Sequence, residues 1–243
     1  MKRWMFALLL TLFACQTAFG GQATAGKKLA KAPPSKPAPA GAVKASEPRL
    51  PFEAYAVADA TSGTVLEGLN MNLKWPQASL TKLMLACVVM DGVDRGDLRL
   101  TDPVAVSKKA EGMGGTQVFL KAGETFTLEE LMQAALIESA NDAAYAIAEH
   151  AAGSAAAFAE RMNRKARSLG MLDTAFYGVH GLPPAPGLND NISTCNDMIR
   201  LAREALRHPK ILEWTSTAQS TFRRGTLVLT NKNKLVGRLP VVD

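Results

Sequence analysis

Ser79 and Lys82 are the two side chains of this sequence best suited to covalent chemistry. They lie three residues apart in Ser79-Leu80-Thr81-Lys82, at the start of an apolar stretch, so a helix would place them on one face about one turn apart. A serine becomes a strong nucleophile when a neighbouring base takes its proton, and a lysine can be that base only if its pKa is lowered. A buried helix with the pair near its positive N-terminal end favours this. The spacing therefore predicts a nucleophile and its general base, although the pattern is weak evidence alone.

A second polar group, Ser139-Ala140-Asn141, lies in the expected connection between two apolar helices. A turn of this kind can direct a hydroxyl and a carboxamide into a cleft beside the first pair. Serine and asparagine are also common helix caps, and Asp142 would serve as a cap equally well. The combination with Ser79 and Lys82 favours a catalytic function for Ser139 and Asn141.

The hydrophobic pattern predicts helices and strands around these groups. Residues 54–68 are expected to form a hairpin around Thr61-Ser62-Gly63, and residues 79–93 a buried helix. Thr127-Leu128-Glu129-Glu130 is a capping box, which predicts that a helix begins there and runs to about Glu138. Further predicted elements are helices at 143–151, 154–169 and 196–207 and a strand at 222–229.

The composition indicates a globular protein, since 47% of the 243 residues are hydrophobic. The formal net charge is +6, but the excess lies near the N-terminus, because residues 49–243 carry 21 basic and 21 acidic side chains. Binding of nucleic acid requires clustered cations on the folded surface. We therefore expect no nucleic-acid partner.

Neither the histidines nor the cysteines have the spacing of a metal site. His150, His180 and His208 are widely separated from one another and from the cysteines, so we expect no metal and no other cofactor. Cys87 lies in an apolar run, where a thiol usually behaves as a small hydrophobic group. Two separate buried thiols are favoured over a disulfide between Cys87 and Cys195, which an oxidising compartment would permit.

The N-terminal segment has the pattern of a secretory signal. Basic residues at positions 2 and 3 precede an apolar run over residues 4–14, and small residues follow near position 20. A run of about 11 apolar residues is too short for a membrane-spanning helix, and Phe13 disfavours lipid attachment at Cys15. We expect an exported protein that acts in the periplasm or at the extracytoplasmic face of the cell envelope.

Three regions follow from these patterns. Residues 1–20 are expected to be a signal peptide, and residues 21–48 a disordered tether rich in alanine, proline and lysine. Residues 49–243 are expected to fold as one catalytic domain.

Residues 76–84, Pro76-Gln77-Ala78-Ser79-Leu80-Thr81-Lys82-Leu83-Met84, resemble the active-serine segment of the low-molecular-mass penicillin-binding proteins, which are serine D-alanyl-D-alanine carboxypeptidases. Other stretches between residues 52 and 243 resemble this family in the same order. They are Gly115-Thr116-Gln117-Val118-Phe119-Leu120 with Gly123-Glu124, Leu136-Ile137-Glu138-Ser139-Ala140-Asn141-Asp142-Ala143-Ala144, Leu169-Gly170-Met171, His180-Gly181-Leu182 and Ser193-Thr194.

The resemblance implies an α/β (α+β) protein with the penicillin-binding-protein/β-lactamase-like fold, in which an antiparallel sheet packs with helices beside a helical region. It implies that Ser79 is the acylated nucleophile, Lys82 the general base, Ser139 a proton relay and Asn141 a substrate-binding residue that also orients Lys82. An oxyanion hole would use the backbone amide of Ser79 and one amide of a later strand. The implied partners are peptidoglycan stem peptides ending in D-Ala-D-Ala, and β-lactams as covalent inhibitors.

The sequence departs from the family pattern in two places. Ala140 stands where many members have glycine. Members also carry a Lys-Thr-Gly strand after the segment that resembles residues 231–243, and the chain reaches Asp243 without it. We therefore expect a C-terminally truncated catalytic domain with weak or no turnover and an exposed sheet edge. Any peripheral membrane association would depend on the missing C-terminal region.

Three other functions are compatible with parts of the pattern. A class A β-lactamase would need a Glu-x-x-Leu-Asn segment, which neither Glu149 nor Glu160 begins. A peptidoglycan DD-endopeptidase shares all the motifs, and the sequence does not separate it from a carboxypeptidase. A non-catalytic domain that senses β-lactams or binds the cell wall is disfavoured by the intact Ser79, Lys82, Ser139 and Asn141.

Overall fold

Helix α1 (Thr81–Asp94) lies at the centre of the fold. The computed structural model describes residues 52–238, so the predicted signal peptide (residues 1–20) and the predicted tether (residues 21–48) lie outside the described residues, where both stay predictions. Of the 14 residues of α1, 10 are buried, as expected for a helix with neighbours on several sides. Ser79 lies just before it, in the short 3-10 helix η1 (Ala78–Leu80).

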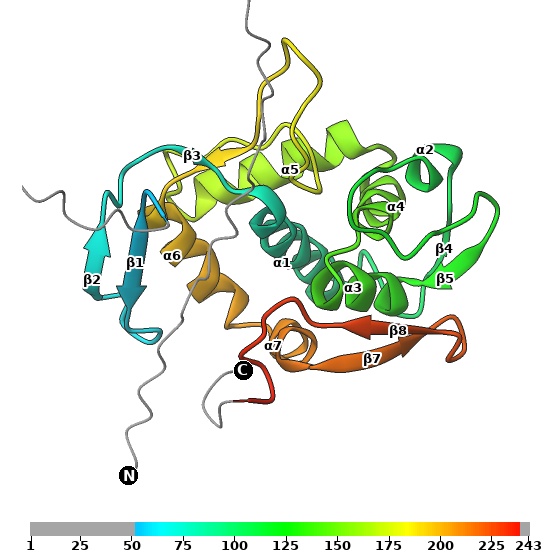
Figure 1. The fold of residues 1–243 in the computed structure, drawn as a ribbon. Coiled ribbons are helices and arrows are strands. Elements are labelled where there is room, and N and C mark those ends of the chain that lie inside the picture. Colours follow the sequence, from blue (N-terminus) through cyan, green and yellow to red (C-terminus); the bar gives the residue numbers. More distant parts are fainter. Residues whose placement is uncertain (1–51, 239–243) are drawn as a thin grey trace, which may run out of the picture. The chain divides into compact units, whose positions relative to one another are not determined.

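Four longer helices pack around α1 (Figure 1). They are α3 (Leu128–Ile137), α4 (Asn141–Ala152), α5 (Ala155–Ser168) and α6 (Cys195–Ala205). These confirm the predicted helices, except that α4 begins two residues earlier than expected. Two shorter helices, α2 (Lys108–Glu111) and α7 (Pro209–Ser216), did not stand out in the sequence.

The predicted capping box is present at the start of α3. Thr127 Oγ1 accepts a hydrogen bond from the backbone N–H of Glu130 at 3.2 Å, and the Glu130 carboxylate accepts one from the Thr127 N–H at 2.8 Å. Two amides that the helix itself cannot satisfy therefore find partners. This fixes where α3 begins.

The described strands pair as four antiparallel two-stranded sheets. The predicted hairpin near the N-terminus is confirmed as β1 (Tyr55–Ala58) with β2 (Val65–Leu69), in a register that pairs Tyr55 with Leu69. The other pairs are β3 (Trp75–Pro76) with β6 (Ile192–Ser193), β4 (Pro103–Ala105) with β5 (Thr125–Thr127), and β7 (Gln219–Phe222) with β8 (Leu227–Thr230). Helices and small antiparallel sheets together give the expected α+β class.

The prediction of one strand over residues 222–229 is wrong. The segment contains the turn of the β7–β8 hairpin, where Arg223, Arg224 and Gly225 have φ values of 51°, 54° and 88°. Two arginines in this left-handed conformation give no turn signal in a sequence. The fold supports Arg223 there, because its guanidinium pairs with Glu124 at 2.7 Å and lies 5.1 Å from the ring centroid of Phe126.

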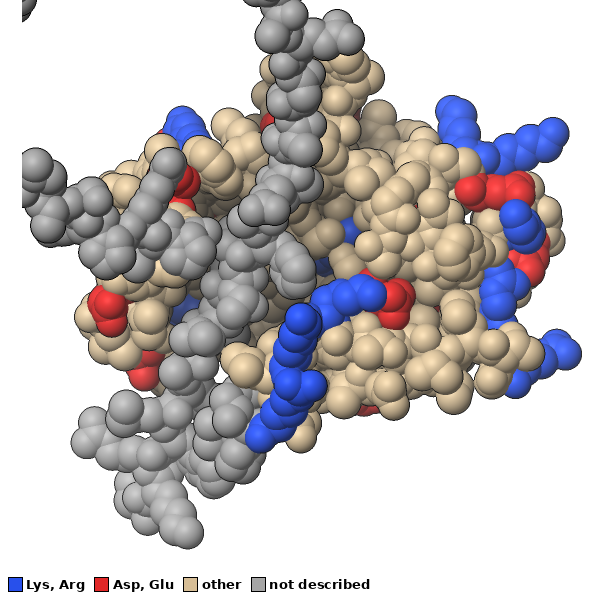
Figure 2. Space-filling view, viewed as in Figure 1, with Lys and Arg blue, Asp and Glu red and all other residues tan. Residues whose placement is uncertain are grey.

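The described surface mixes charges of both signs. Figure 2 shows basic and acidic side chains side by side at the end of the unit that carries β4 and β5, where Lys121 pairs with Glu111 and Arg223 with Glu124. Within residues 52–238, none of the helices combines the length and the apolar content required to span a bilayer.

Candidate active site

Ser79 and Lys82 differ sharply in their exposure to solvent. Ser79 is exposed in η1, whereas the Lys82 side chain enters the core and the residue is only 2% exposed. The Lys82 Nζ lies 3.2 Å from the Ser79 Oγ, so the predicted pair is in hydrogen-bond contact. An exposed hydroxyl with a buried amine behind it can meet a substrate while its base stays out of bulk water.

Two further oxygens surround the amine of Lys82. Its Nζ donates to Asn141 Oδ1 at 2.7 Å and to the backbone carbonyl oxygen of His180 at 2.9 Å. Burial lowers the pKa of Lys82 to about 7, and the negative charge of Asp142 partly opposes this effect. Both the ammonium form and the neutral amine of Lys82 are then accessible near neutral pH.

The hydrogen-bond partners of Lys82 determine what its neutral amine can do. A neutral amine has two N–H groups and one lone pair, and both Asn141 Oδ1 and the His180 carbonyl can only accept. When these two oxygens take the two N–H groups, the lone pair is left for the third neighbour, the hydroxyl of Ser79. The geometry therefore suits transfer of the hydroxyl proton from Ser79 to Lys82.

Asn141 is held so that its oxygen faces Lys82. The residue is 3% exposed at the first position of α4, and its Nδ2 donates to the carbonyl oxygen of Gly114 at 2.8 Å. Asp142, also buried, accepts from the N–H groups of Val118 and Leu120. The residue pair 141–142 thus anchors the segment 114–120 beside the site.

Ser139 lies in the predicted place, the connection between α3 and α4, and is half-buried. Its φ of 66° is in the left-handed region, which costs a non-glycine residue energy and is often found at functional sites. Within the described part of the chain, its hydroxyl makes no hydrogen bond to Ser79, Lys82 or Asn141. The structure brings Ser79, Lys82 and Asn141 together. The role of Ser139 as a proton relay stays a prediction.

His180 was missed as a site residue, since its contribution is a backbone carbonyl that every residue possesses. The only signal was the His180-Gly181-Leu182 stretch. Its imidazole Nδ1 accepts from the Leu182 N–H at 3.0 Å, so the neutral ring carries its proton on Nε2. Burial, and after it the positive charge of Lys82, lowers the pKa of His180 to about 4. The ring is therefore neutral at physiological pH.

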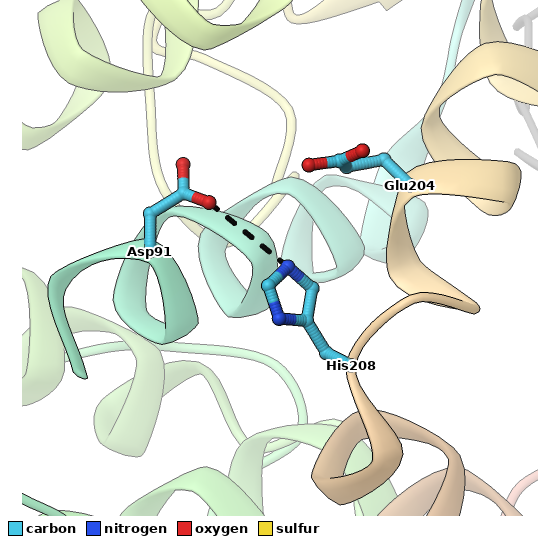
Figure 3. A group of neighbouring side chains, drawn as sticks. All are labelled: Asp91, Glu204 and His208. Carbon is cyan, nitrogen blue, oxygen red and sulfur yellow. Dashed lines mark ion pairs between the residues drawn. The ribbon is translucent and has the colours of Figure 1, made fainter. Parts of the chain in front are cut away.

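A second polar cluster contains Asp91, Glu204 and His208, whose possible ligand atoms lie within 4.8 Å of one another (Figure 3). A cation already lies between the two carboxylates, because the Lys165 Nζ is 2.9 Å from Asp91 and 2.6 Å from Glu204. A metal ion would have to displace this ammonium group. The cluster is thus best described as an ion-pair network that joins α1, α5 and α6.

Both cysteines in the described residues are free thiols. Cys87 is fully buried in α1, and burial raises the pKa of its thiol to about 12. Cys195 is half-buried at the start of α6. The expected absence of a disulfide between them agrees with this structure, although only Cys87 is buried to the expected degree.

The sequence matches known proteins over most of its length. Residues 41–243 match the family model described as D-alanyl-D-alanine carboxypeptidase. The D-alanyl-D-alanine carboxypeptidase DacF of Bacillus subtilis is 36% identical over 185 residues, covering 75% of this chain and 46% of the relative. A D-alanyl-D-alanine endopeptidase of Pseudomonas aeruginosa is 35% identical over 184 residues, covering 74% of this chain and 57% of the relative.

A solved structure gives the same classification. Penicillin-binding protein D2 from Listeria monocytogenes, in its ampicillin-bound form, superposes with a TM-score of 0.69 at 31% identity, covering 79% of this chain and 77% of that one. The expected penicillin-binding-protein fold is therefore confirmed. The chain spans about half the length of the curated relatives it matches.

Proposed function

Because the chain belongs to the D-alanyl-D-alanine carboxypeptidase family of serine peptidases, we propose that its gene product removes the terminal D-alanine from peptidoglycan stem peptides through an acyl-enzyme on Ser79. The observation that carries the proposal is the contact between an exposed Ser79 hydroxyl and a buried Lys82 amine with a pKa of about 7.

Acylation begins when Lys82 takes the proton of the Ser79 hydroxyl. The Ser79 Oγ then forms a bond to the carbonyl carbon of the penultimate D-alanine, and the carbonyl oxygen becomes an oxyanion. The backbone N–H of Ser79 is one donor that can stabilise this charge. When the tetrahedral intermediate collapses, the C–N bond breaks and the amine of the leaving D-alanine takes a proton.

Ser139 and Asn141 are assigned the supporting roles. Ser139 relays the proton from Lys82 to the leaving amine, and the left-handed connection that carries it lies next to α4. Asn141 holds Lys82 through its Oδ1 and contacts the amide of the substrate. Water then attacks the ester carbonyl, returns a proton to the Ser79 oxygen and releases the shortened peptide.

The substrate and the N-terminal sequence together suggest an extracytoplasmic location. Stem peptides of peptidoglycan lie outside the cytoplasmic membrane, so residues 1–20 would act as a signal peptide and the enzyme would work in the periplasm or at the membrane's outer face. β-Lactams would acylate Ser79 in place of the substrate. The ampicillin-bound form of the Listeria protein supports this for a similar chain.

A labelled penicillin and a D-Ala-D-Ala peptide test the proposal on the full-length gene product. We expect covalent labelling of the wild type, none of Ser79→Ala, and release of free D-alanine by the wild type only. Labelling with neither D-alanine release nor cleavage of a cross-linked dimer would indicate a β-lactam sensor instead. Absence of labelling in a folded wild-type protein would overturn the acyl-enzyme mechanism.

An endopeptidase is the second candidate, favoured by the similarity to the Pseudomonas D-alanyl-D-alanine endopeptidase. This activity would use the same acyl-enzyme but would cut the peptide bond of a cross-link. A purified cross-linked dimer of stem peptides distinguishes the two. Conversion of the dimer to monomers identifies an endopeptidase, whereas release of D-alanine alone identifies a carboxypeptidase.

A further inference from the structure

The segment that ends at Leu182 and the Asn191 side chain beyond it contact the Ser79–Lys82 region at three separate points. The His180 carbonyl accepts from the Lys82 Nζ at 2.9 Å. Gly181 lies directly against the backbone of Ala78, the residue before Ser79. The Asn191 side chain, 4% exposed, donates to the Thr81 Oγ1 at 3.0 Å. Thr81 immediately precedes Lys82, so the three contacts cover the whole active-serine turn.

Gly181 is required at its position by geometry. Its φ is +82°, and a Cβ atom there would lie 1.9 Å from the Ala78 carbonyl oxygen and 2.3 Å from the Ala78 carbonyl carbon. Those atoms belong to the backbone and cannot move aside as a flexible side chain can. Ala78 is itself in the left-handed region, with a φ of 46°. Two unusual backbone conformations thus lie against each other beside the nucleophile.

Asn191 anchors the other end of the segment. Its Oδ1 accepts from the N–H groups of Tyr177 and Gly178 at 2.7 and 2.9 Å, and its Nδ2 also donates to the Gly178 carbonyl oxygen at 2.9 Å. One buried carboxamide therefore connects the start of the segment to Thr81 in α1. A buried amide with all these bonds satisfied fixes its neighbours firmly.

We propose that residues 177–182 form a backbone clamp that holds the Lys82 amine against Ser79 and seals it from water, with Gly181 and Asn191 as its positioning residues. The inference rests on the proposed function, since it explains how the proposed base is kept in place. Gly181 fixes the clamp against the turn that carries the nucleophile, and the preceding carbonyl takes one N–H of the base. The distance between nucleophile and base is thereby set by backbone contacts.

The charged groups around Lys82 indicate that the clamp acts by excluding water and not by adding charge. Asp142 on α4 raises the pKa of Lys82, and burial is the larger, opposite effect. His180, the titratable group of the clamp, is neutral because its pKa is about 4. The clamp therefore adds no charge near the amine and acts by excluding water. If it moves away, water reaches Lys82 and the pKa rises toward that of an ordinary lysine.

Gly181→Ala in the full-length protein tests the clamp, with Gly187→Ala as a matched control. Gly187 has a similar φ of +86°, but a Cβ atom there meets nothing within 4 Å. Both substitutions carry the strain of a left-handed alanine, and only Gly181→Ala collides with Ala78. We expect Gly181→Ala to raise the pH at which Lys82 titrates by about one pH unit or more and to slow penicillin acylation at pH 7 about tenfold.

Titration of Lys82 is followed by NMR of ¹³Cε-labelled lysine, with Lys82→Arg to assign the signal. Asn191→Ala, which removes the second anchor without a collision, should shift the titration in the same direction and serves as the deciding variant if Gly181→Ala does not fold. The proposal is overturned if Lys82 titrates in both variants as it does in Gly187→Ala. A wild type that penicillin does not label, with the expected shifts in titration, would refute the proposed function but support the clamp.

Discussion

At the scale of single residues, the neutral form of Lys82 is the feature on which the proposed chemistry depends. Burial lowers its pKa to about 7. Below this pH the ammonium form predominates and cannot accept a proton, so the acylation rate should fall about tenfold per pH unit. Above about pH 8 the rate should level off. His180 adds no step in this range, because its pKa is about 4. Stopped-flow acylation by a chromogenic β-lactam between pH 5 and 9 measures this profile.

Lys82→Arg provides the control for this profile. A guanidinium group keeps its proton throughout this pH range and cannot act as a base. We expect its acylation rate to fall by roughly a thousandfold or more at pH 7, as is usual when a general base is lost together with its position. A rate in the wild type that stays constant from pH 5 to 8 would contradict the role of Lys82.

Loss of the Asp142 charge should shift the pH profile of acylation in the opposite direction from loss of the clamp formed by residues 177–182. Its negative charge raises the pKa of Lys82, so Asp142→Asn should lower that pKa and move the rise in acylation to lower pH. The substitution also weakens the bonds to the Val118 and Leu120 amides, at a cost of about 1–3 kcal/mol in unfolding free energy. The same stopped-flow profile and urea unfolding measure both effects.

Asp173→Asn is the matched control for Asp142. Asp173 is about half exposed and pairs with Lys74 at the surface. Exposed pairs of this kind contribute little and are screened by solvent. The variant should keep the wild-type profile. If Asp142→Asn moved the rise in rate to higher pH, the assigned electrostatic effect would have the wrong sign.

At the scale of elements, α3 must begin and end at fixed residues because its C-terminal end leads into Ser139 and Asn141. Thr127→Ala removes the side-chain half of the capping box, which should lower the unfolding free energy by about 1 kcal/mol. Chemical unfolding followed by circular dichroism measures the loss. Thr125→Ala, at an exposed position of β5 without a capping role, should change it by less than about 0.5 kcal/mol. Equal losses in the two variants would argue against the cap.

The sequence predicted most helices because their signals are local. The capping box at Thr127 and the apolar spacing of α1 depend on neighbours along the chain, and both are present in the structure. The β7–β8 turn was missed because Arg223 and Arg224 adopt left-handed conformations, and the contact that supports Arg223, its ion pair with Glu124, is long-range. Such contacts leave no periodic pattern in the sequence.

In the candidate site too, local sequence patterns revealed some residues, and long-range contacts that leave no such pattern involve the others. The contact between Ser79 and Lys82 follows from helical spacing, and Asn141 was identified from the second polar group and the family resemblance. The His180 carbonyl lies 98 residues from Lys82 along the chain, and a backbone oxygen has no residue type that could reveal it. Asp142 was interpreted only as a possible cap, although it also anchors the amides of residues 118 and 120.

At the scale of the whole molecule, Lys165 joins three helices through one ammonium group. From α5 it contacts Asp91 on α1 and Glu204 on α6, with its own side chain only 14% exposed. Burial opposes its charge, but the hydrogen bonds with Glu204 and Asp91 raise its pKa above the usual value. The network links α1, which carries Lys82, to the helices behind it.

Lys165→Met should destabilise the protein by about 2 kcal/mol, because two partly buried carboxylates would face each other without a cation. Lys210→Met is the matched control, since Lys210 also contacts two carboxylates, Glu129 and Glu213, but is 38% exposed. Lys210→Met should lower the free energy of unfolding by less than about 1 kcal/mol. Urea unfolding at pH 7 compares the two, and equal losses would show that the network adds no more than a surface ion pair.

The difference in unfolding free energy between wild type and Lys165→Met should depend on pH as an ion pair does, and the effect of a chelator separates an ion-pair network from a metal site. Burial opposes ionisation of Glu204, but the hydrogen bond and charge of Lys165 hold its pKa below the usual value. A lowered carboxylate pKa stabilises the fold above its unfolded value of about 4.3, and this contribution is lost as the pH falls through the folded pKa. The gap between wild type and Lys165→Met should therefore narrow in acid below about pH 4. EDTA should leave wild-type unfolding unchanged, whereas a metal held by Asp91, Glu204 and His208 would make the protein less stable in the chelator.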